Sequence, residues 1–284
     1  MNKIYPIIIC TFDRLDKIKT LIDSLNNNLL STESDLFIFS DQGKNFFSKF
    51  KVYLVRRYLK KISGFKSTNI IHRKYNYGMA KNIINGIDYV INLKYDAFIY
   101  LDDDLTLSPY FLKYMNLALS FYNKKKRVMH IAGYFFPITQ IANKNFFMKL
   151  TLSWGWGSWK RVWLSYKKDP NYFIKRFNNK KIHNFNYDGT YNFWQQILNN
   201  KSKVRNTYSI FLYTNLFLKN GLSLTPGRSL VFNNGADGSG VHVKKTKIYD
   251  TKIYKFKPNF TFPKIIKEDI RNRNYIKKYF LKIK

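Results

Sequence analysis

The chain has 284 residues, 45% of them hydrophobic and 18% aromatic, so it can bury a large core and is not a disordered polymer. Fifty Lys and Arg residues against 17 Asp and Glu residues give a formal net charge of +33, which favours anionic partners such as nucleic acid, anionic lipid or phosphorylated substrates. The single cysteine, Cys10, excludes an internal disulfide framework and agrees with a cytoplasmic location, and no apolar run reaches the roughly 20 residues of a membrane-spanning helix.

The first hundred residues alternate between strand-like and helix-like patterns. Short, continuously apolar runs predict strands at 5–12, 36–40, 69–72 and 97–101, and apolar residues at helical spacing predict helices at 15–28 and 78–93. This alternation predicts an α/β domain with a mostly parallel central sheet. In such a sheet, ligands bind outside the carboxyl ends of the strands.

From about residue 130 the pattern is irregular and rich in aromatic residues. It contains a Trp-Gly segment at 153–160, a Gly/Asn loop at 233–240 and a basic stretch from about residue 245. The last part, 275–284, mixes cations with large apolar residues. It fits an interfacial helix at an anionic membrane and equally well a surface helix docked on the domain.

Asp102, Asp103 and Asp104 directly follow the fourth predicted strand in a chain that has few acids. Their mutual repulsion is costly unless a cation offsets it, and Mg²⁺ or Mn²⁺ prefers such oxygen ligands while keeping positions open for substrate phosphates. A structural alternative is that Asp104 caps a helix opened by Ser108 and that the other two carboxylates are solvated.

Polar residues also follow the earlier strands. Arg14, after the first strand, can meet a nucleotide, and Asp41, after the second, can accept hydrogen bonds from a base or ribose. The segment Asn76, Gly78 and Lys81 opens a helix, where free N–H groups and the lysine can receive negative charge. Together these groups predict a nucleotide site at the carboxyl edge of the sheet.

Four motifs combine these residues: Thr11-Phe12-Asp13-Arg14, Ser40-Asp41, Asn76-Tyr77-Gly78-Met79-Ala80 and Tyr100-Leu101-Asp102-Asp103-Asp104-Leu105. The set resembles the GT-A glycosyltransferases of the family-2 type. Residues 101–111 are also similar to the metal-motif region of N-acetylglucosaminyltransferase I. Residues 153–161 and the stretch from 221 through 242 are similar to bacterial sugar transferases of surface polysaccharides.

The resemblance, which spans about residues 5–243, implies a GT-A, Rossmann-like fold with a short basic C-terminal extension. It places a GT-A domain at 1–244, with a nucleotide-sugar half at 1–105 and an acceptor-side half at 106–244, and a basic tail at 245–284. It also implies that Asp104 binds Mn²⁺ or Mg²⁺, with His242 as a further candidate ligand. Donor binding is implied for Thr11, Arg14, Asp41, Asp102 and Asp103.

An inverting transfer needs a general base beside the acceptor hydroxyl. In β-1,4-galactosyltransferases a similar Trp-Gly-Trp-Gly segment is followed by acids, but this chain has no acid at the corresponding residues 158–160. N-acetylglucosaminyltransferase I has its base in a Trp-Asp-Asp-Trp segment, and the nearest counterpart here, 208–211, also has no acid. The remaining candidates are Asp188 and Asp237. Asp188 is equally interpreted as an ordinary turn residue.

Trp154, Trp156 and Trp159 are either core residues or aromatic platforms for the sugar ring of the acceptor. We favour an acceptor-side wall, because flat aromatic side chains flanked by glycine suit sugar rings. The loop 233–240 has the glycine content expected of a lid that closes over the donor.

The sequence therefore predicts a metal-dependent, inverting glycosyltransferase that moves GlcNAc or a hexose from a UDP-sugar to a glycan or lipid-linked acceptor. Its context would be lipopolysaccharide or capsule synthesis on the inner face of the cytoplasmic membrane. One alternative, a basic nucleic-acid-binding protein, is motivated by the charge but leaves the acidic triplet unexplained, so no specific nucleic acid is expected. The other, a nucleotidyltransferase, would normally carry a glycine- and lysine-rich signature after the first strand, where this chain has Thr11-Phe12-Asp13-Arg14.

Overall fold

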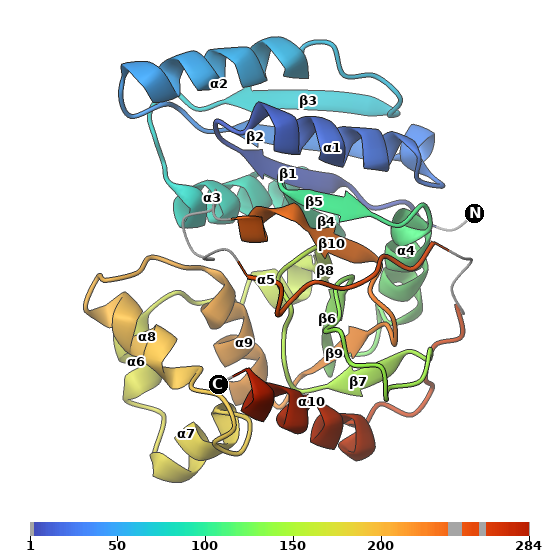
Figure 1. Cartoon of the computed structure of the whole chain (residues 1–284), viewed down its shortest axis with the longest axis vertical. Coiled ribbons are helices and arrows are strands. Elements are labelled where there is room, and N and C mark those ends of the chain that lie inside the picture. Colours follow the sequence, from blue (N-terminus) through green and yellow to red (C-terminus); the bar gives the residue numbers. More distant parts are fainter. Residues whose placement is uncertain (1–2, 238–245, 256–259, 284) are drawn as a thin grey trace.

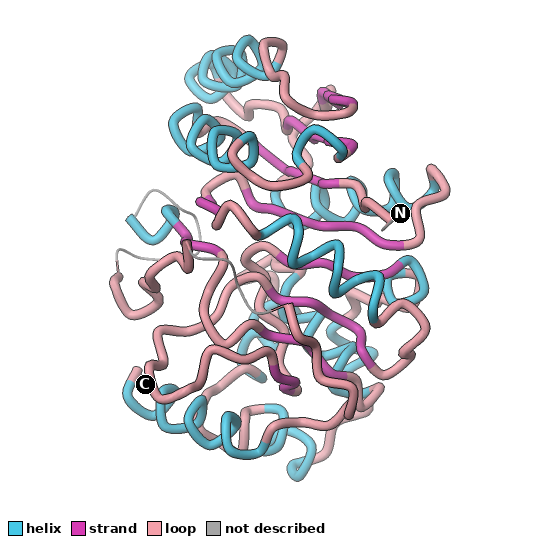
Figure 2. Tube along the Cα trace, turned by 90° about the vertical axis from the view of Figure 1, so that its right-hand side faces the viewer, coloured by secondary structure: helices cyan, strands magenta, loops and turns pink. Residues whose placement is uncertain are grey.

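A computed structural model of the chain describes residues 3–237, 246–255 and 260–283 (Figure 1). An eight-stranded sheet in the order β3-β2-β1-β4-β8-β6-β9-β7 runs through the molecule, and its strands succeed one another along the long axis (Figures 1 and 2). The strands of this sheet are β1 (Ile7–Thr11), β2 (Asp35–Ser40), β3 (Ser67–His72), β4 (Ala97–Asp102), β6 (Val128–Ala132), β7 (Phe146–Met148), β8 (Trp156–Trp159) and β9 (Leu222–Thr225).

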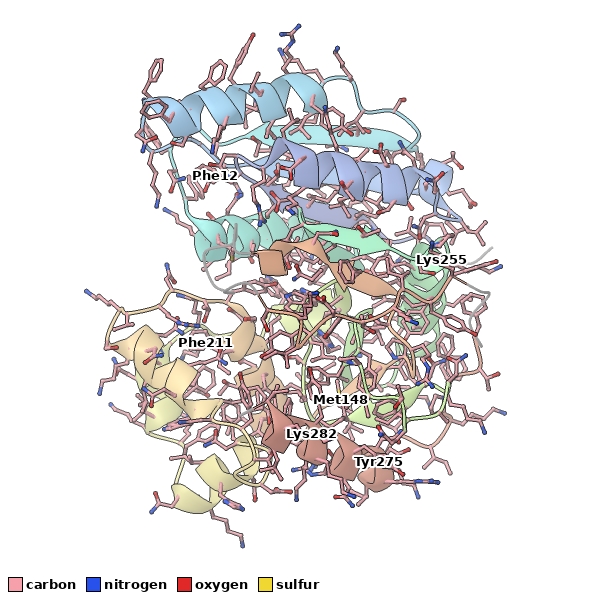
Figure 3. The ribbon with its side chains drawn as sticks, in the orientation of Figure 1. Phe12, Met148, Phe211, Lys255, Tyr275 and Lys282 are labelled. Atoms are coloured by element: carbon pink, nitrogen blue, oxygen red, sulfur yellow. The ribbon has the colours of Figure 1, made fainter. Side chains whose placement is uncertain are left out.

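The pairings confirm a mostly parallel sheet. Strands β3, β2, β1 and β4 are parallel to one another, as are β6 and β9. Only β8 and β7 run against their neighbours. The carboxyl ends of the four N-terminal strands therefore share one edge of the sheet, which we call the carboxyl edge. Phe12, which follows β1, marks this edge in Figure 3.

Helices cover both faces of the sheet. They are α1 (Leu15–Asn26), α2 (Phe46–Leu59), α3 (Met79–Asn92), α4 (Phe111–Phe121), α5 (Lys160–Trp163), α6 (Pro170–Ile174), α7 (Asn179–Phe185), α8 (Trp194–Lys201), α9 (Ser209–Leu218) and α10 (Ile270–Lys282), with 3₁₀ turns η1 (Ser31–Glu33) and η2 (Asn234–Asp237). Ile83, Ile87 and Val90 of α3 pack against one face in one hydrophobic cluster, while α1 and α4 belong to the cluster on the other. The predicted helices at 15–28 and 78–93 are confirmed; α2 was not predicted.

A second, two-stranded antiparallel sheet joins distant parts of the sequence. It pairs β5 (Leu105–Leu107) with β10 (Val231–Asn233), so that Asn233 lies opposite Leu105. Because β5 directly follows the acidic triplet, this pairing carries the glycine-containing segment after β10 to the end of β4.

The C-terminal segment is built into the fold. The Tyr254 N–H donates to the Ser229 carbonyl and the Asp269 N–H to the Phe147 carbonyl, and Ile276 and Phe280 of α10 are buried. The segment 275–284 therefore forms a helix docked on the domain, with Ile276 and Phe280 covered by protein and Leu281 exposed. In the described part of the chain, no helix has both the length and the apolar character needed to span a bilayer.

Candidate active site

The acidic triplet lies at the carboxyl edge, where β1 and β4 run side by side with Cys10 in register with Asp102. Asp103 is buried and fixed from β1: the Thr11 hydroxyl donates to its Oδ2 at 2.8 Å, the Phe12 N–H donates to the same oxygen at 3.4 Å, and an Arg14 guanidinium nitrogen pairs with its Oδ1. These bonds bring the loop after β1 onto the triplet, and nucleotide binding by Thr11 and Arg14 stays a prediction.

Arg14 connects two of the three carboxylates. Its Nη1 also lies 2.9 Å from Oδ2 of Asp104. Burial alone would lower the pKa of Arg14, but attraction to Asp103 and Asp104 raises it above its ordinary value. The guanidinium is therefore held charged, as a single cation between two carboxylates.

The segment after β10 closes over Asp104. The Asn234 N–H donates to the Asp104 carbonyl at 2.8 Å, and the Asn234 side chain donates to the Thr106 hydroxyl at 2.7 Å. Gly235 lies so close that a Cβ at that position would fall far inside van der Waals contact with Asp104 Oδ2. Only a glycine permits this approach of backbone to carboxylate.

One oxygen of Asp104, Oδ1, is buried and has no hydrogen-bond partner in the described part of the chain. Burial, and then the negative charge of Asp103, raise the pKa of Asp104 above its ordinary value. A buried carboxylate oxygen without a partner is costly, and a hard divalent cation is a fitting partner for it. In the described ranges, no group of three or more His, Cys, Asp or Glu side chains could hold a metal alone, so substrate phosphates would have to complete the ligand set, as is usual for Mg²⁺.

Asp102 is the third carboxylate. The Tyr100 hydroxyl donates to its Oδ1 at 2.8 Å. Burial first, and then the charge of Asp104, raise the pKa of Asp102 to about 8, against the lowering effect of the tyrosine bond. Both raised pKa values show that burial and mutual repulsion disfavour the charged carboxylates, and a bound cation would relieve that repulsion.

Asp41 organises the neighbouring loop. Its carboxylate accepts from the N–H groups of Gln42, Tyr77 and Gly78 at 2.8–2.9 Å. Gly78, with a φ of +71°, precedes α3, and a Cβ there would meet no atom of the described residues within 4 Å, so its outer side is open toward them. Asn76 donates to the Gln42 carbonyl at 2.6 Å. Asp41 and Asn76 therefore join the ends of β2 and β3 into one rim.

Two arginines that the sequence analysis did not single out complete this rim. Arg56 of α2 donates to the carbonyls of Ser40, Asp41 and Arg73. Arg73 donates to Asn82 at 2.8 Å, and its guanidinium lies over the rings of Phe39 and Tyr77 at 4.9 and 4.6 Å.

The Nη2 of Arg73 is buried and has no partner within the described ranges, so this rim holds a cationic donor. Arg73 follows β3 directly, and this position after a strand was the signal that could have found it. Lys81, a predicted donor contact, lies over the Tyr77 ring at 4.6 Å.

Asp188 lies in a different environment. Its two carboxylate oxygens pair with Arg273 at 3.0 Å and Lys277 at 3.1 Å, both on α10. Burial alone would raise its pKa, but the hydrogen bonds from these two cations lower it. Its backbone φ of +58° is that of a tight turn. Of the two interpretations of Asp188, candidate base and turn residue, these contacts favour the turn residue, because a carboxylate held by two cations accepts a proton poorly.

Two of the three tryptophans are core residues. Trp156 and Trp159 are fully buried in β8, which pairs with both β4 and β6, and the Trp159 indole donates to the Leu119 carbonyl at 3.1 Å. The prediction that they form an acceptor wall is wrong for both, because a central strand is covered on its two faces. Trp154 is partly buried against Tyr134 and Tyr249 and stays a prediction.

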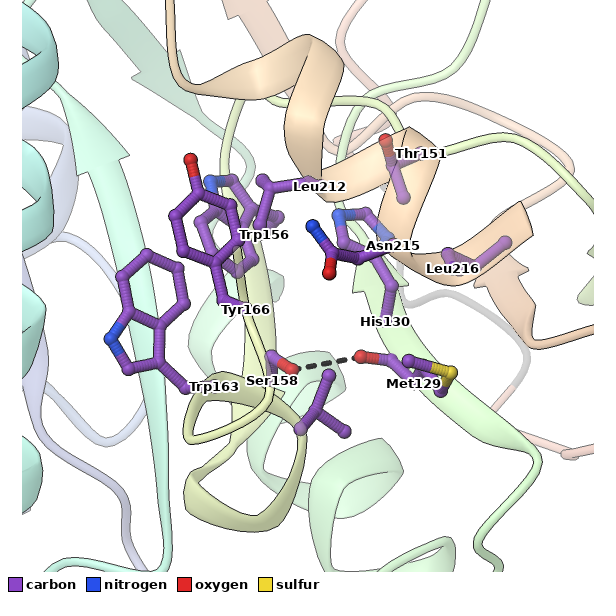
Figure 4. A pocket seen from close by; sticks show the side chains of 11 residues that line it. Met129, His130, Thr151, Trp156, Ser158, Trp163, Tyr166, Leu212, Asn215 and Leu216 are labelled. Atoms are coloured by element: carbon purple, nitrogen blue, oxygen red, sulfur yellow. Dashed lines mark hydrogen bonds between the residues drawn. The ribbon is translucent and has the colours of Figure 1, made fainter. Parts of the chain in front are cut away.

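Trp156 also lines a small internal cavity of about 20 Å³, together with His130, Tyr166, Leu212 and other residues (Figure 4). His130 stacks on Trp156, and its Nδ1 lies 2.7 Å from the Ser223 hydroxyl. Burial lowers the pKa of His130 to about 3, so the imidazole is neutral. The space suits at most one water molecule and is too small for a nucleotide or a sugar.

The remaining predicted residues belong to the glycine loop. Asp237 ends η2, two positions after Gly235, so the backbone places it on the segment that touches Asp104. His242 and residues 238–240 of the predicted lid lie outside the described residues.

Comparison with solved structures supports the architecture. The chain is similar to GalNAc-T7, in a crystal structure with UDP, GalNAc and Mn²⁺, at a TM-score of 0.51 and 9% identity, over 81% of this chain and 43% of that one. Two S. aureus TarS structures match more loosely, the 1–349 fragment at a TM-score of 0.47 and 10% identity over 83% of this chain and 61% of that one, the other at 0.36 and 14% over 51% and 25%. The chain thus spans less than two thirds of the length of each.

No curated protein matches the chain by sequence. The family Glycosyl transferase family 2, however, matches residues 7–193, which is more than half of the chain and includes every strand of the carboxyl edge together with the acidic triplet. With its mostly parallel sheet and this match, the chain has a GT-A fold and belongs to glycosyl transferase family 2.

Proposed function

We propose that this chain is a metal-dependent, inverting glycosyltransferase that moves GlcNAc or a hexose from a UDP-sugar to a glycan or lipid-linked glycan acceptor. Surface polysaccharide synthesis would be its context. The observation that carries the proposal is the buried Oδ1 of Asp104, which has no hydrogen-bond partner among the described residues, in a triplet whose ion pairs within that part of the chain are made with Arg14.

In this proposal Asp104 holds Mn²⁺ or Mg²⁺, and the bound metal supplies Lewis-acid character that offsets negative charge on the departing diphosphate. Arg14 keeps Asp103 and Asp104 in place and reduces their mutual repulsion. Asp102 faces the ribose or the sugar of the donor.

The rim made by Asp41, Asn76, Gly78 and Lys81 receives the nucleotide, and the partly buried guanidinium of Arg73 adds positive charge there. Thr11 contributes by fixing Asp103. These are the groups that an anionic, base-containing donor needs: a hydrogen-bonding rim, cations and an open glycine turn.

Asp237 is the remaining candidate for the base that takes the proton of the acceptor hydroxyl, because its segment lies against Asp104 whereas Asp188 is committed to α10. Trp154 is the remaining candidate for an acceptor-side aromatic surface.

The experiment is thermal unfolding of the full chain with UDP, GDP, CMP or ADP, each with and without Mn²⁺. UDP and Mn²⁺ come first because the GalNAc-T7 structure, similar in fold, holds both. A nucleotide at about 100 times its Kd stabilises the fold by roughly 2.7 kcal/mol, and we expect this shift for UDP only when metal is present.

Asp104→Asn should remove the metal-dependent shift. The matched control is Asp96→Asn, which changes an exposed carboxylate at the opposite end of β4, where it pairs with Lys3. A shift that persists in Asp104→Asn, or the absence of a shift with every nucleotide, would contradict the proposal.

A further inference from the structure

Helix α2 has two chemically different faces. Val52, Val55 and Leu59 are buried on the side that faces the domain. On the other side Phe46, Phe47, Phe50 and Tyr53 are exposed, at 79%, 77%, 57% and 57%. Residues 46, 50 and 53 fall on one stripe because helical neighbours recur every three or four positions. We call these four side chains the aromatic face of α2.

Cations surround the aromatic face. The segment 44–61 contains no Asp or Glu, and its exposed cations are Lys44, Lys49, Lys51, Arg57, Lys60 and Lys61. Large aromatic side chains flanked by Lys and Arg are the composition of helices that lie in the interface of anionic bilayers. Anionic head groups complement this charge, whereas a basic partner would be repelled.

The helix is well placed to present this face. Its start is fixed by Asn45 and Ser48, each of whose side chains accepts from the other's backbone N–H, so the aromatic residues of the first turn are held in helical geometry. Figure 1 shows α2 at one end of the molecule, beyond the edge strand β3.

The aromatic face begins beside the candidate site. Strand β2 ends at Ser40 and α2 begins at Phe46, so the first turn of the helix lies at the carboxyl edge. Two more exposed side chains follow β3 at the same edge, Tyr75 at 76% and Met79 at 45%. A surface that covers this end of the molecule would therefore border the nucleotide rim.

We propose that the aromatic face of α2 and its flanking lysines dock the chain on the surface of an anionic phospholipid bilayer. The sequence pattern alone suggested the C-terminal helix for this role, but Ile276 and Phe280 of α10 are buried, whereas four aromatic side chains of α2 are 57–79% exposed. This docking stands on the composition of α2 and is independent of the proposed sugar transfer.

The test is co-sedimentation of the full chain with vesicles of phosphatidylcholine alone and of phosphatidylcholine mixed with phosphatidylglycerol. We expect binding to the anionic vesicles only, weakened by added salt. The triple variant Lys49→Gln, Lys60→Gln, Lys61→Gln should bind on the order of a hundredfold more weakly. The triple variant Phe46→Ser, Phe47→Ser, Phe50→Ser should bind roughly tenfold more weakly or worse.

Matched controls remove the same chemistry elsewhere. The control for the charges is the triple variant Lys124→Gln, Lys125→Gln, Lys126→Gln, which removes three exposed charges from the loop before β6, several strands away from β3. The control for the apolar side chains is Leu164→Ser, which removes an apolar side chain that is 68% exposed. Both should bind anionic vesicles nearly as the unaltered chain does. All variants change exposed side chains, so their thermal unfolding should match that of the unaltered chain.

Two results would overturn the proposal. The first is equal binding to both kinds of vesicle, or equal loss in the helix variants and in the controls. The second is a dimer of the unaltered chain in solution that the three Phe→Ser changes convert to a monomer, because the aromatic face would then be an interface between copies.

Discussion

Two groups of carboxylates in this chain have opposite balances of charge. In the acidic triplet, Asp103 and Asp104 both pair with Arg14, and burial with mutual repulsion raises the pKa of Asp102 and of Asp104. Asp188 pairs with Arg273 and Lys277, Arg273 pairs with Glu268 as well, and the two cations lower the pKa of Asp188.

This difference in cationic partners distinguishes the acidic triplet, which can bind a further cation, from Asp188, whose charge is already neutralised by Arg273 and Lys277. An acidic group with spare negative charge gains from a metal ion, whereas a carboxylate with two cationic partners contributes to the fold that positions those partners. Both were candidates for the reaction in the sequence, and only their surroundings distinguish them.

The largest expected effect is at the triplet. Asp104→Ala should reduce metal-dependent sugar transfer by about a thousandfold or more, since a Lewis-acid contribution of several kcal/mol is lost. Turnover is measured as release of UDP from the UDP-sugar across a range of Mn²⁺ concentrations. An Asp104→Ala chain with full activity would remove the metal assignment, and Asp96→Ala, in an exposed pair with Lys3, should retain its activity.

The next largest effect is expected at Gly235, in the segment after β10 that lies against Asp104. In Gly235→Ala the new methyl group would overlap Asp104 Oδ2, so the loop or the carboxylate must shift. A displacement of about 1 Å at a reacting centre can cost about a hundredfold in rate, and we expect a loss of roughly ten- to a hundredfold in turnover.

The control for this change is Gly64→Ala, at a surface turn with a φ of +93° before β3. It should lower thermal stability with turnover per folded molecule unchanged. If both variants lose turnover equally, proximity to Asp104 is not the cause.

At Asp188 we expect a loss of stability and no loss of turnover. Asp188→Asn removes the charge that Arg273 and Lys277 share, so the free energy of unfolding should fall by about 1–2 kcal/mol, partial exposure reducing the loss. Turnover per folded molecule should not change. Denaturant unfolding and initial rates measured on the same preparation check both parts, and a large loss of rate at unchanged stability would restore Asp188 as a candidate base.

The smallest effect is the pH dependence of the stability that Asp188 contributes. A carboxyl group whose pKa is lowered in the fold stabilises it above the unfolded pKa of about 3.9, and the contribution is lost as the pH falls through the folded pKa. The gap in unfolding free energy between the unaltered chain and Asp188→Asn should therefore be constant from about pH 5 to 8 and close in more acidic solution. A gap that widens on acidification would contradict the ion-pair account.

Much of the N-terminal half could be predicted from local pattern. The strands that became β1, β2, β3 and β4 are short apolar runs, and α1 and α3 carry clear apolar periodicity. Helix α2 was missed because its aromatic residues point outward while its valines point inward, so apolar residues lie around much of its circumference and blur the period.

The second half needed tertiary information. The glycines around Trp156 and Trp159 suggested an exposed platform, but strand pairing places this segment in the middle of the sheet. The partners of Asp188 lie 85 and 89 positions along the chain, and no local pattern connects such distant residues.

By itself, the sequence determined the mostly parallel α/β domain and the position of the acidic triplet at the end of a strand, because both depend on periodicity and on adjacency along the chain. The tertiary structure alone decided that Gly235 reaches Asp104, that Arg14 connects two acids and that Asp188 belongs to α10. These depend on the pairing of β5 with β10 and on the packing of the C-terminal helix, contacts whose cost in chain entropy is repaid only when the whole fold forms.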